Sequence, residues 1–212
     1  MIELFLKGGL MMWPILAASV VALTVVIERL CFVAQEKRRR QPEVVGEVLA
    51  RAERGDPAGA IQAAKGSRDF VARTLLYALE HRERSVSDAL LRAAGRELQR
   101  YNRGLSILDT VITLAPLLGL LGTVTGMIHS FSLLGGKELG APQAITGGIA
   151  EALIATAFGL GVTILALIPF NTLNAVMEKA RHDLQDAATH LELCLTRPPA
   201  AETLEAETRG GR

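Results

Sequence analysis

Glu151 is the residue whose type and position most clearly suggest chemistry. It is the only acidic residue in an apolar run that extends from Leu139 to Met177. An ionised carboxylate is costly to place in hydrocarbon, so such a residue usually faces a protein interior or a water-filled path. Because desolvation disfavours the charged form, we expect Glu151 to be protonated when enclosed and to ionise when it meets water or a partner. The residue therefore suggests ion transport.

Stripes of small residues accompany Glu151 and recur in the preceding apolar segment. Drawn on helices, they fall along one side of residues 142–177 and along one side of residues 110–136. Such stripes allow membrane helices to approach each other closely. We expect helix-packing contacts from Gly119, Gly122, Gly126, Gly148, Ala155 and Gly159.

Two threonines, Thr123 and Thr156, accompany these stripes. Pairing of the stripes would bring both hydroxyls near Glu151. One carboxyl and two hydroxyls suit proton transfer better than chelation of a cation, which needs several oxygen ligands. Two alternatives stay open at this point. A membrane threonine often bonds a carbonyl of its own helix, and a lone Glu could pair with a partner helix or lie at the outer interface.

Two further titratable residues are possible accessories. His129 lies near the outer end of its apolar segment, where an interfacial residue is the usual interpretation and a proton relay the alternative. Asp109 lies near the inner end, either at the interface or as a gate for proton exit.

The rest of the chain shows no pattern typical of an enzyme. Phosphate-binding loops, His-Glu-x-x-His and nucleophile elbows are absent from the sequence. Cys31 and Cys194 have no metal-binding spacing, and we expect two free thiols. The sequence therefore predicts a protein that is not an enzyme and that has no cofactor and no metal. The ion that we expect it to translocate is the proton.

Three segments are long enough to span a bilayer, which needs about 20 apolar residues. They are Gly8–Ile27, Thr110–Gly136 and Pro142–Met177. Charged residues gather between them and in the tail. This distribution predicts an all-α membrane protein with three transmembrane helices, two of them extended into the cytoplasm, and a helical cytoplasmic domain.

The basic residues predict the orientation. The segment from Gln35 to Leu105 holds fifteen Lys and Arg against ten Asp and Glu, whereas the loop after the second span holds Lys137 and Glu138. The positive-inside rule places the long segment and the C-terminus in the cytoplasm and the N-terminus outside.

The expected organisation has seven parts. They are an N-terminal segment with the first transmembrane helix, a helical cytoplasmic domain, the second helix, a short external loop, the third helix, a cytoplasmic helical extension and a disordered tail. Their ranges are 1–35, 36–104, 105–136, 137–141, 142–177, 178–197 and 198–212.

Local signals predict helices in the cytoplasmic domain. Glu43–Arg54 and Ser67–Glu83 have helical character, and Gly55-Asp56-Pro57 ends one helix and begins another. Ser85 resembles the first residue of a capping box. With no strong breaker before Pro116, we expect one long helix from Val86 to about Leu134.

Two motifs resemble a known family. The run Ala115–Met127, with sequence APLLGLLGTVTGM, is similar to the second-helix signature of the MotA/TolQ/ExbB proton-channel family. The run Gly148–Leu160, GIAEALIATAFGL, is similar to its third-helix signature. The three-helix layout resembles the ExbB/TolQ branch.

This resemblance implies properties that residue spacing does not show. Members form homopentamers around two copies of a single-span partner of the ExbD/TolR type, in the bacterial inner membrane and without nucleic acid. The assembly uses the proton motive force to drive a TonB- or TolA-like protein. The essential Glu of the family matches Glu151, and its polar threonines match Thr123 and Thr156. His129 stands where relatives often carry Asn.

Two other classes of function are alternatives. The first is a non-conducting membrane scaffold of the same architecture, which has little reason to keep Glu151 and both threonines. The second is a permease that works without an ion gradient, which would need a broader cavity than two small-residue stripes suggest. The sequence therefore favours a subunit of a proton channel.

Overall fold

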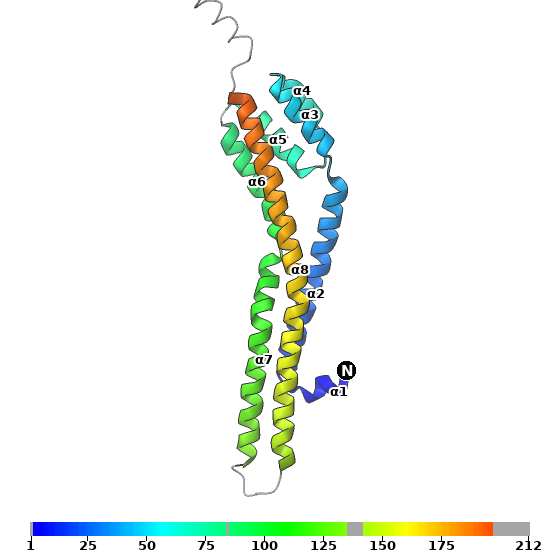
Figure 1. Ribbon diagram of the computed structural model, residues 1–212, viewed down its shortest axis with the longest axis vertical. Coiled ribbons are helices and arrows are strands. Elements are labelled where there is room, and N and C mark those ends of the chain that lie inside the picture. Colours follow the sequence, from blue (N-terminus) through cyan, green and yellow to red (C-terminus); the bar gives the residue numbers. More distant parts are fainter. Residues whose placement is uncertain (1, 84, 135–141, 197–212) are drawn as a thin grey trace, which may run out of the picture. The chain divides into compact units, whose positions relative to one another are not determined.

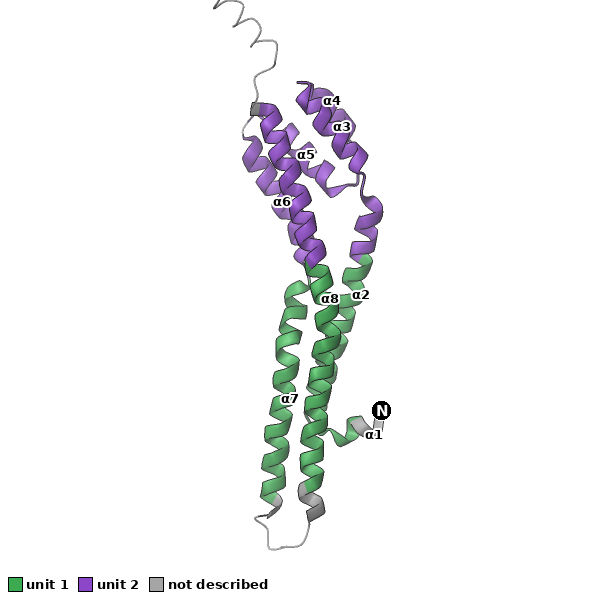
Figure 2. Cartoon of the chain, viewed as in Figure 1, with its two compact units in different colours: residues 1–31, 104–174 green, residues 32–103, 175–212 purple. Residues whose placement is uncertain are grey.

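The computed structural model describes residues 2–83, 85–134 and 142–196, and the regular structure in these ranges is entirely helical (Figure 1). The predicted external loop, 137–141, and tail, 198–212, lie outside the described residues. The chain divides into two compact units (Figure 2). Unit 1 is Met1–Cys31 with Gly104–Asn174, and unit 2 is Phe32–Arg103 with Ala175–Arg212. The prediction of an all-α protein is confirmed.

Unit 1 contains the apolar helices. It consists of α1 (Ile2–Lys7), α2 (Met12–Arg39) as far as Cys31, α7 (Leu105–Leu134), and α8 (Pro142–Thr196) as far as Asn174. By length and composition, three helical stretches of the described chain could cross a membrane. Large apolar side chains of unit 1 stay exposed, among them Leu117, Ile128 and Leu165. A soluble domain rarely exposes so much apolar surface. The chain is therefore a membrane protein.

The first membrane helix begins later than the hydropathy of the sequence suggested. A turn at residues 8–11 separates α1 from α2 (Figure 1). Gly9 has a φ of 71°, a backbone conformation that glycine adopts readily. The ring of Phe5 packs edge-on against Trp13, with centroids 5.4 Å apart. Because this glycine-containing turn lies within an apolar run, hydropathy alone does not predict it.

The long helix expected from Val86 to about Leu134 is divided into α6 (Val86–Asn102) and α7. Gly104 has a φ of 81°, and the Arg103 N–H donates to the carbonyl of Gln99, 3.1 Å away. A Cβ built on Gly104 would lie 3.0 Å from Val25 Cγ1. Glycine thus permits both the turn and the close approach of α2. In contrast, α8 continues without a break through Pro169.

Unit 2 contains a small helical core. Its helices are α3 (Pro42–Glu53), α4 (Pro57–Ala64), α5 (Phe70–Glu80) and α6, together with the remaining parts of α2 and α8. The predicted helices at Glu43–Arg54 and Ser67–Glu83 correspond to α3 and α5, and α5 begins and ends three residues inside the predicted range. The core is formed by apolar residues of all these helices, including Val48, Ala60, Leu75, Leu90, Leu184 and Leu191.

Side-chain caps begin the helices of unit 2 where the sequence indicated. The Asp56 carboxylate accepts a hydrogen bond from the Gly59 N–H at 2.8 Å, and the Ser85 hydroxyl accepts one from the Asp88 N–H at 3.2 Å. Such caps satisfy N–H groups that the first helical turn leaves unpaired.

Asp69 combines a cap with an ion pair. It is fully buried and accepts hydrogen bonds from the N–H groups of Val71 and Gln41, at 2.8 and 2.7 Å. Arg40 donates to Asp69 at 3.2 Å and to Asp183 at 2.9 Å. These bonds connect α5, α8 and the residues that join α2 to α3. Close by, burial raises the pKa of Tyr101, and the neighbouring carboxylate of Glu36 raises it further.

Candidate ion-translocation site

The two small-residue stripes lie against each other along α7 and α8, which run side by side (Figure 1). A Cβ built on Gly119 would lie 3.0 Å from Thr156 Cα, and one built on Gly159 would lie 2.5 Å from the Ala115 carbonyl oxygen. Both distances leave little or no room for a side chain. The two backbones are therefore in contact at this level of the helix pair.

The same close approach continues toward Glu151. A Cβ on Gly122 would lie 2.6 Å from the Cβ of Ala155, and a Cβ on Gly126 would lie 3.0 Å from the Gly148 carbonyl oxygen. The hydroxyl of Ser130, which is buried, occupies the space that a side chain on Gly148 would need. At Gly122, Gly126 and Gly148, the absence of a side chain thus makes room for an atom of the facing helix.

Thr156 forms a polar link within this apolar interface. Its hydroxyl donates a hydrogen bond of 2.9 Å to the Gly119 carbonyl oxygen on α7. This differs from the common pattern, in which a membrane threonine bonds a carbonyl of its own helix. Thr156 therefore contributes directly to the pairing of the two helices.

Glu151 is half-buried on α8, and its carboxyl reaches the turn between α1 and α2. A Cβ built on Gly9 would overlap Glu151 Oε1 and would lie 2.6 Å from the carboxyl carbon. On the same face, a Cβ built on Gly8 would lie 3.0 Å from Ile154 Cγ2. The absence of a side chain at Gly9 thus makes the space in which the carboxyl lies.

A pocket of about 190 Å³ opens at Glu151. His129 and Thr125 of α7 line it, together with residues of the 8–11 turn and of the α7 stripe: Gly8, Leu10, Met11, Gly122 and Gly126. The pocket is bounded by three parts of unit 1, and an imidazole, a hydroxyl and a carboxyl share it. This combination can accept, hold and pass on a proton.

The structure places the other predicted residues apart from this pocket. The Thr123 hydroxyl donates to the Leu120 carbonyl oxygen of its own helix, at 2.7 Å, and Thr123 is not among the residues that line the pocket. Asp109 is exposed near the start of α7. Of the residues predicted from the sequence, the structure therefore brings Glu151 and His129 to one pocket. Thr156 lies on the same helix as Glu151, at the contact between α8 and α7.

Sequence reasoning missed the 8–11 turn and Thr125. The pair Gly8-Gly9 is a recognised turn signal, but it was included in the apolar run of the first span. Thr125 lies two residues from Thr123, and its hydroxyl lies 2.9 Å from the Leu121 carbonyl oxygen that accepts its hydrogen bond. Which residues of α7 line the pocket depends on which side of α7 faces the 8–11 turn. Because the sequence does not predict this turn, it does not predict Thr125 as a lining residue.

Comparison with known proteins identifies relatives of this chain. A family model described as the MotA/TolQ/ExbB proton channel family matches residues 62–186. The protein named ExbB-like 1 of Synechocystis sp. is 39% identical over 201 residues, covering 91% of this chain and 78% of its own length. ExbB-like 3 of the same organism is 35% identical and is covered over 93% of its length.

A third relative matches over a shorter part of the chain. TolQ of the Tol-Pal system from Haemophilus influenzae is 38% identical over 91 residues, which are 43% of this chain and 40% of TolQ. The family match includes both small-residue stripes, Glu151 and His129. The chain belongs to the MotA/TolQ/ExbB proton channel family, in its ExbB/TolQ branch.

Proposed function

We propose that this chain is a proton-conducting subunit that converts the proton motive force into work on an envelope process or on biopolymer transport. The observation that carries the proposal is the position of Glu151, a half-buried carboxyl that shares a pocket with His129 and Thr125. A carboxyl placed between apolar helices and a polar pocket can bind a proton from one side and release it toward another. Membership of a proton channel family supports the same conclusion.

The proposed assembly follows the family. Five copies of the chain surround two copies of a single-span partner of the ExbD/TolR type, and the complex acts on a TonB- or TolA-like protein. The exposed apolar side chains of α7 and α8, such as Leu120 and Leu153, provide surface for such neighbours. Glu151 is then one of a ring of carboxyls.

The proposed orientation places unit 2 in the cytoplasm and the 8–11 turn near the outer side of the bacterial inner membrane. Its support is the excess of basic residues between Gln35 and Leu105. The Glu151 pocket then receives protons from the outer side. The proposed ion is H⁺ rather than Na⁺, because the pocket offers one carboxylate, whereas metal cations favour several oxygen ligands.

Two other functions fit the structure less well. A non-conducting scaffold would not need a half-buried carboxyl that shares a pocket with an imidazole. A permease for small molecules usually has a pocket of about 300–1,000 Å³, and the pocket at Glu151 measures about 190 Å³.

The decisive experiment replaces Glu151 by Gln, which keeps the size of the side chain and removes its titration. The variant is expressed together with a single-span protein of the ExbD/TolR type from the same organism, and proton uptake is measured in proteoliposomes under an imposed potential. We expect normal assembly, measured by native mass spectrometry, and loss of proton flux.

The control is Glu178→Gln, which changes an exposed glutamate of the same helix. We expect wild-type flux from this control. Wild-type flux from Glu151→Gln in an assembled complex would exclude the proposal and favour the scaffold.

A further inference from the structure

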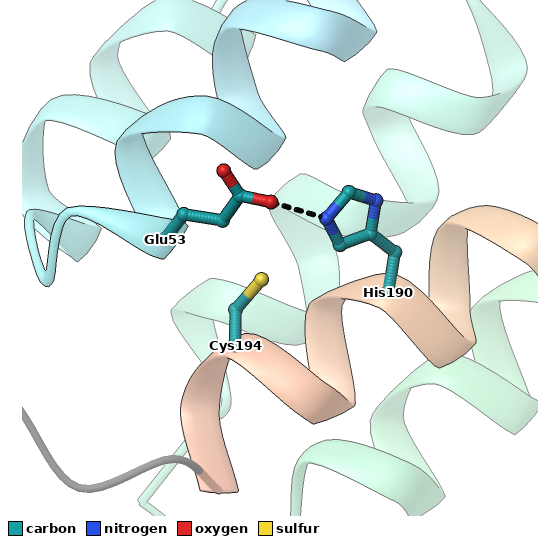
Figure 3. A group of neighbouring side chains, drawn as sticks. All are labelled: Glu53, His190 and Cys194. Atoms are coloured by element: carbon teal, nitrogen blue, oxygen red, sulfur yellow. Dashed lines mark hydrogen bonds and ion pairs between the residues drawn. The ribbon is translucent and has the colours of Figure 1, made fainter.

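A group of three metal-binding side chains lies in unit 2, remote in sequence from Glu151. Glu53 ends α3, and His190 and Cys194 lie one turn apart on α8 (Figure 3). One ligand atom from each residue lies within 4.8 Å of the other two. Figure 3 shows the three side chains directed toward the same space. Because Glu53 and His190 are 137 positions apart in the sequence, sequence spacing does not reveal the group.

The chemistry of the group is specific. Imidazole nitrogen, thiolate sulfur and carboxylate oxygen are the three side-chain ligands that zinc uses in proteins. His190 and Cys194 are separated by four positions on a helix, a spacing that brings both side chains to one face. Hard cations such as Mg²⁺ and Ca²⁺ prefer oxygen ligands, so a set with one oxygen selects against them.

The distances are compatible with a metal after a small adjustment. Ligand atoms bound to zinc at about 2.0–2.3 Å in a tetrahedron lie about 3.3–3.8 Å from one another. In the structure the imidazole Nε2 of His190 lies 2.6 Å from Glu53 Oε1, as a hydrogen-bonded pair. Side-chain rotations that move the ligand atoms by about 1 Å would separate this pair and shorten the longer separations, which are at most 4.8 Å. Both residues are surface side chains free to make that rotation, with about half of each exposed.

The site is also accessible from water. His190 lines a groove of about 270 Å³ together with Asp186, whose carboxylate favours the approach of a cation, and with Asp183, which is paired with Arg40. Cys194 is partly covered, which limits its contact with larger reagents while leaving the sulfur beside the other two ligands.

We propose that Glu53, His190 and Cys194 form a site for a divalent transition metal of the zinc class, which joins α3 to α8. The three side chains supply three ligands, and water completes a tetrahedron. On binding, the Cys194 thiol loses its proton to water and forms the metal–sulfur bond as a thiolate. The proton that His190 Nε2 donates to Glu53 Oε1 is exchanged through water so that the imidazole carries its proton on Nδ1, and Nε2 and Oε1 then each bind the metal. This site is independent of the proton path at Glu151.

The test uses the full chain without a polyhistidine tag, purified in detergent and titrated with Co²⁺ and then with Zn²⁺. We expect one equivalent of Co²⁺ per chain, a thiolate-to-cobalt charge-transfer band, and bleaching of that band when Zn²⁺ displaces the cobalt. In Cys194→Ser the band should disappear. In His190→Ala and Glu53→Gln the affinity should fall at least about 10–100-fold, the range typical for loss of a supporting residue around a metal.

Two matched controls sharpen the result. Cys31→Ser removes the other thiol, and His182→Ala removes an exposed histidine two turns earlier on α8. Both should bind metal as the wild type does. Absence of a thiolate band in the wild type, or equal binding by wild type and Cys194→Ser, would overturn the proposal and leave a hydrogen bond between Glu53 and His190 as the whole role of the group.

Discussion

The carboxyl of Glu151 lies in the space where a side chain at Gly9 would begin. The relationship joins a residue of the third membrane helix to the turn that precedes the first. Because the two residues are 142 positions apart in the sequence, their contact depends on the complete folding of unit 1. The turn thus limits the positions that the carboxyl can take, in addition to the helices on either side of it.

Gly9→Ala should displace the Glu151 carboxyl and reduce proton flux. The added methyl overlaps Oε1, an overpacking that costs about 1–3 kcal/mol, and alanine at a positive φ costs about 1–2 kcal/mol more. Proton flux in proteoliposomes and thermal unfolding measure the two effects. Gly55→Ala is the matched control, since Gly55 has a φ of 72° and a Cβ added there would have no atom within 4 Å. Equal loss of flux in both variants would show that backbone strain, and not the position of the carboxyl, is responsible.

Thr156→Ala should weaken the pairing of α7 and α8, whereas Thr156→Ser should preserve it. The hydroxyl bond to the Gly119 carbonyl contributes about 0.5–1.5 kcal/mol, and serine keeps the donor. Thermal unfolding of the detergent-solubilised protein measures the difference. Thr123→Ala provides the comparison, because its hydroxyl bonds only its own helix in the structure described. We expect reduced flux from both alanine variants but reduced stability mainly from Thr156→Ala, and a stable Thr156→Ala would contradict the role of the interhelical bond.

His129→Asn should lower proton flux. An imidazole nitrogen can take up and release a proton during a transfer, whereas the amide of asparagine cannot, and His129 shares the pocket with Glu151. Proton flux in proteoliposomes measures the effect. His81→Asn, at an exposed position of unit 2, should leave the flux unchanged. Wild-type flux from His129→Asn would restrict the pathway to Glu151 and the hydroxyls.

Asp69→Ala should destabilise unit 2 without altering the Glu151 pocket. The cap lost at the start of α5 is worth about 1 kcal/mol, and a hydrogen bond to a charged group about 1.5–3 kcal/mol, so we expect a loss of about 2–4 kcal/mol. Circular dichroism during thermal unfolding measures the change. Asp56→Ala removes an exposed cap with one hydrogen bond to the Gly59 N–H and should cost about 1 kcal/mol. Similar losses in the two variants would mean that the ion pair with Arg40 adds little.

Features that depend on local pattern could be predicted from the sequence. The spacing of Gly119, Gly122 and Gly126 places all three on one side of a helix, and the small residues around Glu151 lie on one side of another helix. Close packing of these two sides could therefore be expected. The caps at Asp56 and Ser85 followed from residue type alone.

Features that depend on distant residues could not be predicted in the same way. The turn at Gly9 lies inside an apolar run, where hydropathy conceals a break in the helix. Gly104 inside a helical pattern is usually tolerated at a cost of about 1 kcal/mol, and only the positive φ adopted beside Val25 reveals the end of α6. The group formed by Glu53, His190 and Cys194 required the fold of unit 2.

The contact of backbone with backbone between α7 and α8 restricts how unit 1 can move. If α7 turned about its own axis by the angle between neighbouring residues, Leu118 or Leu120 would face Thr156 in place of Gly119, where even a Cβ would lie only 3.0 Å from Thr156 Cα. The two helices therefore resist rotation against each other at this contact. A displacement of the Glu151 side chain is then accommodated more easily at the turn of residues 8–11, against which the carboxyl lies, than between the two helices.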